Sequence, residues 1–475
     1  MSAERDESDE ETRDGEGPPG SAPATPPEKK SLARTSLGLL PAQIVFRGGE
    51  AIFPWLLATW FGRSHATDVY TFAWAIFTFA GSLVFSAYQD SALVPLLAEV
   101  RKNSPSELPR FRGALLAHTV VYGSALALFI AFVAAAYFLL VYDGADQTMA
   151  ERMVPGFLVY LIALSLKTFF AAQLNAEHRY FALPVASAFG TAVAVGTLAL
   201  ARSIGPVVIP YAQLAGELVT LGFLIRFSRH MHFAWNLARP PALVRVGRLI
   251  ASEVFGAAIT RINPSVDQLF AGLVGIAGGG TLLRLTGDVA SLPTSLLQAV
   301  LLSVLLTHLS EDATKLDYRG FRAKTTGALR VTLLTLSAAC LVLHFARVPL
   351  LRAVFRHGAM DEEGVQRMAE VLPYSLVGVP TFGALLVLVR AHIAAQNSRV
   401  MVKMGLLNAA LNLLGNAVLG KLLGLRGIAL STSVVHAAVA LVLYVLLKRR
   451  LAELERSHET ATREPSAEPH QEERS

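Results

Sequence analysis

Charged residues inside long apolar stretches are the feature of this sequence that most limits its fold. They are Arg47, Glu50, Asp90, Glu253, Arg261, Asp267, Arg284 and Asp288. A charge at the centre of a membrane helix costs about 2.5–3.5 kcal/mol on insertion scales. These side chains must therefore pair with one another or face a water-filled space between helices, and such a concentration of charge indicates the path of a polar cargo.

The apolar stretches themselves predict an all-α polytopic membrane protein. Hydrophobic residues make up 53% of the chain and charged residues only 16%, which excludes an ordinary soluble globule. Because a spanning helix needs about 20 residues, we expect twelve. Their ranges are 37–62, 69–98, 113–141, 153–174, 181–202, 204–227, 246–274, 279–309, 325–346, 365–395, 400–420 and 424–447.

Basic residues collect in alternate loops, and this sets the expected orientation in the membrane. Lys and Arg are dense in 101–112, 226–248, 319–324, 399–403 and 448–450. The loop after the ninth helix, with Arg352, Arg356 and Arg367, is an exception. The positive-inside rule then places both termini in the cytoplasm. The net charge of +6 is thereby explained by topology, without a nucleic-acid partner.

A weak sequence match suggests an internal repeat of six helices. Ala171-Ala172-Gln173 ends the fourth helix, and Ala394-Ala395-Gln396 ends the tenth. We expect lobes over 36–230 and 245–447, related as a parallel repeat that rocks around a central cavity. Residues 1–35 are expected to form a disordered cytoplasmic tail, and 448–475 a polar cytoplasmic tail.

Signals of catalysis are weak in this sequence. The segment from Gly415 to Leu422 resembles a phosphate-binding loop but lacks the Ser or Thr that must follow its lysine. Cys340 is the single cysteine, so no intramolecular disulfide can form, and a small buried hydrophobe is expected there. We expect neither an enzyme nor a cofactor, with transport driven by an ion gradient, the membrane potential or the substrate's own gradient.

The cations of the apolar stretches are candidates for binding an anionic substrate. Arg47 with Glu50, and Arg284 with Asp288, are spaced for a local ion pair on one helix face. Either each pair only makes its helix insertable, or the arginine contacts a phosphate through its planar fork. Arg261 has no acid three or four residues later. Acids outnumber bases in this set, which argues against the simplest anion carrier.

A second candidate site uses oxygen ligands. Asn408 and Asn412 stand one turn apart, and with Asp267 they could bind a monovalent cation. Hydrogen bonding between helices is the alternative explanation of these amides.

Several segments of the chain resemble the MurJ/MviN family of lipid-linked peptidoglycan precursor flippases, part of a superfamily with polysaccharide flippases and multidrug extruders. The matching segments are Phe61-Gly62, Ala66-Thr67-Asp68, Val94-Pro95-Leu96-Leu97-Ala98-Glu99, Val266-Asp267-Gln268-Leu269-Phe270-Ala271, Leu292-Pro293, Phe355-Arg356-His357-Gly358-Ala359-Met360, Gly378-Val379-Pro380, Asn397-Ser398-Arg399, Leu411-Asn412 and Gly427-Ile428-Ala429-Leu430-Ser431-Thr432-Ser433. Asp68 joins the substrate candidates, and Thr432 joins the cation candidates.

Departures from the family pattern concern its arginines. Arg47 matches an arginine of the family's first helix. At the position of the second arginine of that helix, this chain has Phe53. The family's arginine-rich stretch corresponds to residues 79–83, which contain no arginine in this chain. The family's Asp-Arg pair corresponds to Gly287-Asp288. Members of the family usually carry two further C-terminal helices. The resemblance therefore implies the fold more firmly than the cargo.

The function that the resemblance implies is a flippase of the bacterial inner membrane. It would move an undecaprenyl-pyrophosphate-linked glycan, lipid II by family default, from the inner to the outer leaflet by alternating access. A flippase for a surface-polysaccharide repeat unit is one alternative, and a cation-coupled drug or metabolite antiporter is another. A membrane glycosyltransferase is disfavoured because no large loop offers a catalytic site. We expect a monomer whose partners are membrane lipids.

Overall fold

The computed structural model describes residues 52–87, 93–177, 179, 181–239, 263–298, 303–395 and 397–463, and these residues form helices and short connections without a strand. The helices are Ile52–Phe61, α2 (His65–Ala87), α3 (Val94–Asn103), α4 (Leu108–Val141), α5 (Gly144–Ala176), α6 (Ala182–Ala201), α7 (Val208–Phe227), residues 263–273, α9 (Gly279–Leu297), α10 (Ser303–Thr314), α11 (Tyr318–Phe355), α12 (Glu362–Ala394), α13 (Ser398–Leu423) and α14 (Leu425–Arg463). The predicted all-α class is confirmed.

Eight candidate membrane spans are long and apolar enough to cross a bilayer within the described ranges. They correspond to α4 to α7 and α11 to α14. The predicted second span corresponds to α2 and α3, and the predicted eighth to α9 and α10; residues 88–92 and 299–302 between these helices lie outside the described residues. The chain is therefore a polytopic membrane protein, and the expected total of twelve helices is left untested.

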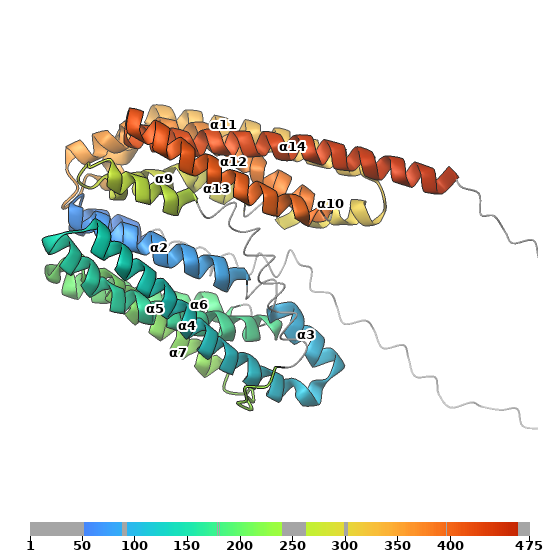
Figure 1. Ribbon diagram of the computed structural model, residues 1–475, viewed down its shortest axis with the longest axis horizontal. Coiled ribbons are helices and arrows are strands. Elements are labelled where there is room, and N and C mark those ends of the chain that lie inside the picture. Colours follow the sequence, from blue (N-terminus) through green and yellow to red (C-terminus); the bar gives the residue numbers. More distant parts are fainter. Residues whose placement is uncertain are drawn as a thin grey trace, which may run out of the picture.

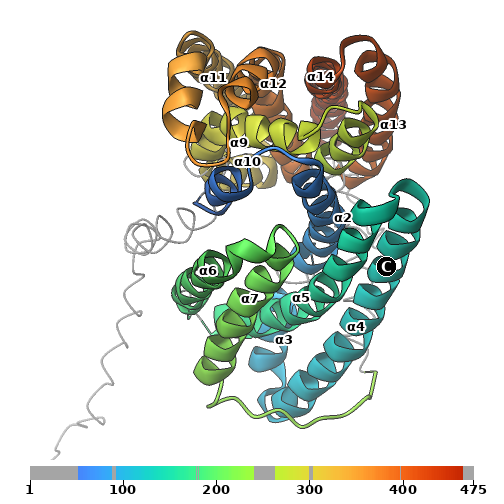
Figure 2. The same ribbon diagram turned by 90° about the vertical axis from the view of Figure 1, so that its left-hand side faces the viewer.

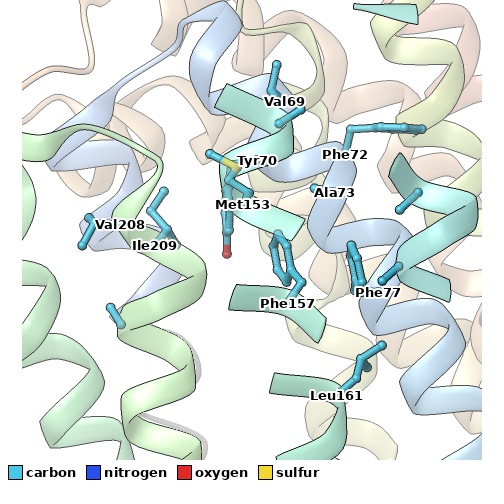
Figure 3. Packing of buried hydrophobic residues seen from close by; sticks show 14 of the residues in the cluster. Val69, Tyr70, Phe72, Ala73, Phe77, Met153, Phe157, Leu161, Val208 and Ile209 are labelled. Atoms are coloured by element: carbon cyan, nitrogen blue, oxygen red, sulfur yellow. The ribbon is translucent and has the colours of Figure 1, made fainter. Parts of the chain in front are cut away.

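Helices α2 to α7 form the N-terminal lobe, which packs around an aromatic core (Figure 3). Tyr70 and Phe77 of α2 meet Phe157 of α5, and the rings of Phe77 and Phe157 stack with their centroids 4.7 Å apart. Met153 and Phe157 are fully buried. The core fixes one face of α2 against α5, and this leaves another face of α2 free to line the centre of the molecule.

Residues 263–273 and helices α9 to α14 form the C-terminal lobe. Helix α12 packs against α9, α11 and α14, and its buried residues Leu385 and Leu388 join Val439 and Leu443 of α14. Cys340 lies buried in α11 as a free thiol, so the expectation of a small buried side chain is confirmed.

The two lobes lie side by side at one end of the molecule and diverge toward the other (Figure 1). Helices α2 and α9 contact each other across the boundary, and both begin at the end where the lobes meet. In the perpendicular view, α2 lies between α9 above and α5 below (Figure 2). This arrangement makes α2 and α9 the walls of any space between the lobes.

Helix α14 continues well past the predicted end of its span at 447, to Arg463. Its extension is rich in Leu, Ala, Glu, Lys and Arg, the residues with the highest helix propensity. Arg322 of α11 pairs with Glu455 at 3.0 Å and holds the extension against the neighbouring helix. The first part of the predicted polar tail is therefore helical.

Candidate functional site

A cavity of about 560 Å³ lies between the two lobes. On α2 it is lined by residues three or four apart, Thr71, Trp74, Ala75 and Thr78, and on α9 by Arg284, Gly287, Asp288 and Ser291. These spacings place each set on a single helix face. Further lining comes from Asn263, Asp267, Gln268, Phe382, Thr432 and His436. Most of the polar side chains of the cavity lie on its C-terminal side, and an indole ring lies on its N-terminal side.

Arg284 is the cation that the described part of the structure places in this cavity. Its Cζ lies 5.7 Å from the ring centroid of Trp74 and 6.0 Å from that of Tyr70, so the guanidinium spans the boundary between the lobes. Among the described residues no carboxylate lies within 4.0 Å of it, although Asp288 follows one turn later. Its buried Nη1 has no hydrogen-bond partner there.

An unpaired buried donor is costly, by about 1–3 kcal/mol. Of the two alternatives for Arg284 and Asp288, the geometry of the described residues favours an arginine available to a ligand over a closed local ion pair. A phosphate oxygen is a suitable acceptor for the free Nη1, because charge-assisted hydrogen bonds from arginine to phosphate are among the stronger ones.

Asp267 lies at the C-terminal wall of the cavity, within a cluster of polar side chains. Its Oδ1 accepts hydrogen bonds from Asn412 at 3.1 Å and Asn416 at 2.7 Å, and its Oδ2 accepts one from Thr432 at 2.7 Å. Asn408 instead pairs with Asn263, donating at 2.7 Å. Three of the four cation candidates are thus brought together, and Asn408 contacts the neighbouring amide.

Asn416 belongs to this cluster and was missed by the sequence argument. It follows Asn408 and Asn412 at the same four-residue spacing, so the helical repeat of α13 could have identified it. Its Oδ1 is buried without a hydrogen-bond partner among the described residues.

Asp68 lies outside the residues that line the cavity. Its Oδ1 accepts hydrogen bonds from the backbone nitrogen of Thr281 at 2.9 Å and from the Thr281 hydroxyl at 3.1 Å. A carboxylate near a helix N-terminus is stabilising, so Asp68 of α2 caps α9 and ties the two lobes together. Arg47, Glu50 and Arg261, the remaining substrate candidates, lie outside the described residues.

The end where the lobes meet is closed by further contacts between them. The indole nitrogen of Trp55 donates to the Val354 carbonyl oxygen, and the Ala359 amide donates to the Thr59 carbonyl oxygen, each at 2.7 Å. We call the ion-paired set Arg63, Asp361 and Glu363 the latch. Arg63 donates to both carboxylate oxygens of Asp361, at 2.8 and 2.9 Å, and also contacts Glu363.

Breaking the latch is expected to admit reagents from this end. In a Cys340→Ser background, Thr78→Cys places a single thiol in the cavity wall. Arg63→Ala should raise its labelling by a membrane-impermeant thiol reagent, added from the side of the latch, by about two- to fivefold, as expected for a partly exposed ion pair. Arg426→Ala is the matched control, because Arg426 pairs with Glu370 within the C-terminal lobe. Equal labelling in all three proteins would show that the latch does not hold this end closed.

The latch is expected to be independent of pH in the physiological range. The hydrogen bond from Arg63 lowers the pKa of Asp361 from 3.8 to about 2. A lowered pKa stabilises the latched state above the ordinary value, and this contribution is lost as the pH falls through the lower one. At each pH, the labelling of folded Thr78→Cys is divided by the labelling of the same variant after unfolding. This ratio should be constant between about pH 8 and pH 5. An increase over that interval would assign closure to another titrating group.

Two helical lobes around a central cavity, joined by contacts at one end, are the architecture of a membrane transporter. Comparison with known proteins identifies the family to which the chain belongs. The family model for the lipid II flippase MurJ matches residues 57–462, and the chain therefore belongs to the MurJ family.

The relatives agree with this assignment. A lipid II flippase MurJ of Burkholderia cenocepacia is 24% identical over 83% of this chain and 80% of its own length. A probable lipid II flippase MurJ of Rhizobium tropici is 24% identical over 83% of this chain and 77% of its own length. Among solved structures, a lipid II flippase MurJ in an inward closed conformation superposes with a TM-score of 0.75 at 18% identity, covering 88% of this chain and 90% of its own.

A multidrug resistance MATE family transporter of the MOP superfamily, in an inward-facing conformation, superposes with a TM-score of 0.72 at 11% identity, covering 87% of this chain and 96% of its own. At these identities the structural likeness supports the fold. The family assignment rests on the match along the sequence.

Proposed function

We propose that this protein moves lipid II from the inner to the outer leaflet of the bacterial inner membrane by alternating access. The observation that carries the proposal is Arg284, a guanidinium with an unpaired buried donor in a cavity between two lobes. A pyrophosphate entering a low-dielectric cavity needs charge-assisted partners. Membership of the MurJ family supports the choice of lipid II over other anionic lipids.

The latched end faces the outside in this proposal, and both termini are cytoplasmic. The connections at that end, 62–64, 275–278 and 356–361, fall on the side that the distribution of Lys and Arg assigns to the outside. The state described here is then closed to the outside. A monomer suffices, because one chain supplies both walls of the cavity.

Growth rescue tests the choice of cargo. In a bacterium depleted of its own MurJ, expression of this chain should restore growth if the cargo is lipid II. A flippase for a surface-polysaccharide repeat unit is the alternative, because the family's arginines at 53 and 79–83 are missing. Failure to rescue despite membrane expression, together with loss of a surface polysaccharide when the native gene is deleted, would transfer the assignment to polysaccharide export.

We also propose that a monovalent cation binds at Asp267 and couples to transport. The carboxylate of Asp267 and the hydroxyl of Thr432 lie together with the amides of Asn412 and Asn416, which donate to Asp267 in this state. The Oδ1 of Asn416 is without a partner among the described residues. Hard oxygen ligands suit such an ion. Rotation of the two amides would turn their oxygens toward it.

Removing the carboxylate should remove the response to sodium. A cation present at a hundredfold excess over its Kd stabilises the folded protein by about 2.7 kcal/mol. Sodium chloride, compared with choline chloride, should raise the Tm of the wild-type protein but leave that of Asp267→Asn unchanged. Asp312→Asn is the control, because Asp312 is a buried acid of the same lobe that pairs with Lys324. A sodium response that survives in Asp267→Asn would contradict the site.

A further inference from the structure

Trp74 is a lining residue of the cavity that the proposed function leaves without a role. It lies on the same face of α2 as Thr71 and Thr78, and it is only partly buried. Tyr160 and Phe157 of α5 pack against its ring, with centroids 5.8 and 6.2 Å away. An indole supported by other rings has little freedom to reorient, so it offers a fixed apolar surface within the cavity.

The position of Trp74 relative to Arg284 matches the order of groups in a sugar pyrophosphate. The guanidinium carbon lies 5.7 Å from the centroid of the indole, so the two groups are adjacent. In the cargo of the proposed function, the first sugar is bonded directly to the pyrophosphate. A phosphate held by Arg284 therefore places that sugar beside Trp74.

The chemistry of the surrounding wall suits a pyranose. The C–H face of a sugar ring carries partial positive charge and packs on the negative face of an aromatic ring. Around that contact the sugar's hydroxyls need polar partners, and Thr78, Asp288 and Ser291 line the same cavity. An aromatic plane with a few convergent polar groups is the usual composition of a specific ligand pocket.

We propose that Trp74 is the stacking platform for the first sugar of the lipid-linked cargo and determines the flippase's selectivity for it. The proposal rests on the proposed function, in which Arg284 binds the pyrophosphate. It assigns Arg284 to the phosphate and Trp74 to the sugar, so the two residues have separable effects on binding.

A matched pair of short-chain ligands separates these effects. Farnesyl pyrophosphate and farnesyl-pyrophosphoryl-N-acetylglucosamine differ by the sugar alone. Trp55→Phe, Trp60→Phe and Trp235→Phe together leave Trp74 as the single tryptophan. The sugar-bearing compound should change the fluorescence of Trp74 at saturation, whereas farnesyl pyrophosphate should leave it nearly unchanged.

Affinities measured in the otherwise wild-type protein provide the decisive comparison. Trp74→Leu should weaken binding of the sugar-bearing ligand by about tenfold, as expected for loss of one aromatic contact, and leave binding of farnesyl pyrophosphate unchanged. Trp74→Phe should retain most of the affinity. Trp60→Leu is the matched control, because Trp60 also lies under an arginine, Arg202, but outside the cavity lining.

Two results would overturn the inference alone. In one, Trp74→Leu binds both ligands as the wild-type protein does, and in the other it weakens both equally, which would reduce Trp74 to a support for Arg284. If the wild-type protein binds neither compound, the proposed function fails and the inference fails with it.

Discussion

Arg284→Gln is expected to lower the outward flux of lipid II by about 10- to 150-fold. Glutamine keeps a polar side chain of similar reach but loses the charge. A hydrogen bond to a charged group contributes about 1.5–3 kcal/mol, and that range sets the size of the effect. Because Arg284 also lies over Trp74 and Tyr70 of the other lobe, flux must be normalised to the amount of folded protein in the membrane.

Arg202→Gln is the control for this substitution. Arg202 lies over the ring of Trp60 at 5.8 Å, yet it is exposed and does not line the cavity. Its replacement should leave the flux unchanged. Arg284→Lys should be intermediate, because an ammonium keeps the charge but cannot present the planar fork. Wild-type flux in Arg284→Gln would remove Arg284 from the substrate site.

Gly427→Ala is expected to cost about 2 kcal/mol or more of stability. Helices α13 and α14 form a tight hairpin through Gly424, whose φ is +62°. A Cβ at Gly427 would lie 1.8 Å from the carbonyl oxygen of Leu419. Since that atom belongs to the backbone, the helices must separate to accommodate even one methyl group.

Gly196→Ala gives the matched control within a membrane helix of the N-terminal lobe. A Cβ there meets nothing within 4 Å, so alanine should be neutral or slightly stabilising. Thermal unfolding of the purified proteins in one detergent, together with the yield of monodisperse protein, measures both variants. Equal Tm values for Gly427→Ala and the wild type would show that α13 and α14 approach less closely than described.

The sequence indicated the cavity wall because the cost of charge in lipid is a local property of each helix. It identified Arg284, Asp288 and Asp267, and the structure brings all three to one cavity. It also grouped Asn412 with Asp267, which the structure places at 3.1 Å. It did not separate Asn408 from this cluster, since helical spacing alone cannot tell which neighbour a side chain on that face will meet.

Contacts between the lobes were beyond a reading of the sequence. Arg63 and Asp361 are 298 positions apart, and no local pattern connects them. Asp68 was grouped with the substrate residues from a matching segment, and that role stays a prediction. The structure adds that its carboxylate caps α9. Such roles depend on which helix ends meet, and that is decided by the packing of whole lobes.

The arginines that form the exception to the charge pattern are ion-paired in the structure. Arg352, in the last turn of α11, and Arg356, just after that helix, lie on the side that the positive-inside rule expects to be poor in basic residues, and both pair with Glu362. Arg367 pairs with Glu363 one turn away. Each of these three arginines is therefore ion-paired with a carboxylate at the same end of the molecule.

Exposure of lipid II at the outer face of the membrane tests the central claim most directly. Spheroplasts from cells depleted of their own MurJ accumulate radiolabelled lipid II in the inner leaflet, where an added lipid II hydrolase cannot reach it. Expression of this chain should make that pool susceptible to cleavage, and Arg284→Gln at equal membrane level should not. Lipid II that stays protected although the wild-type chain is folded in the membrane would contradict the assignment as a lipid II flippase.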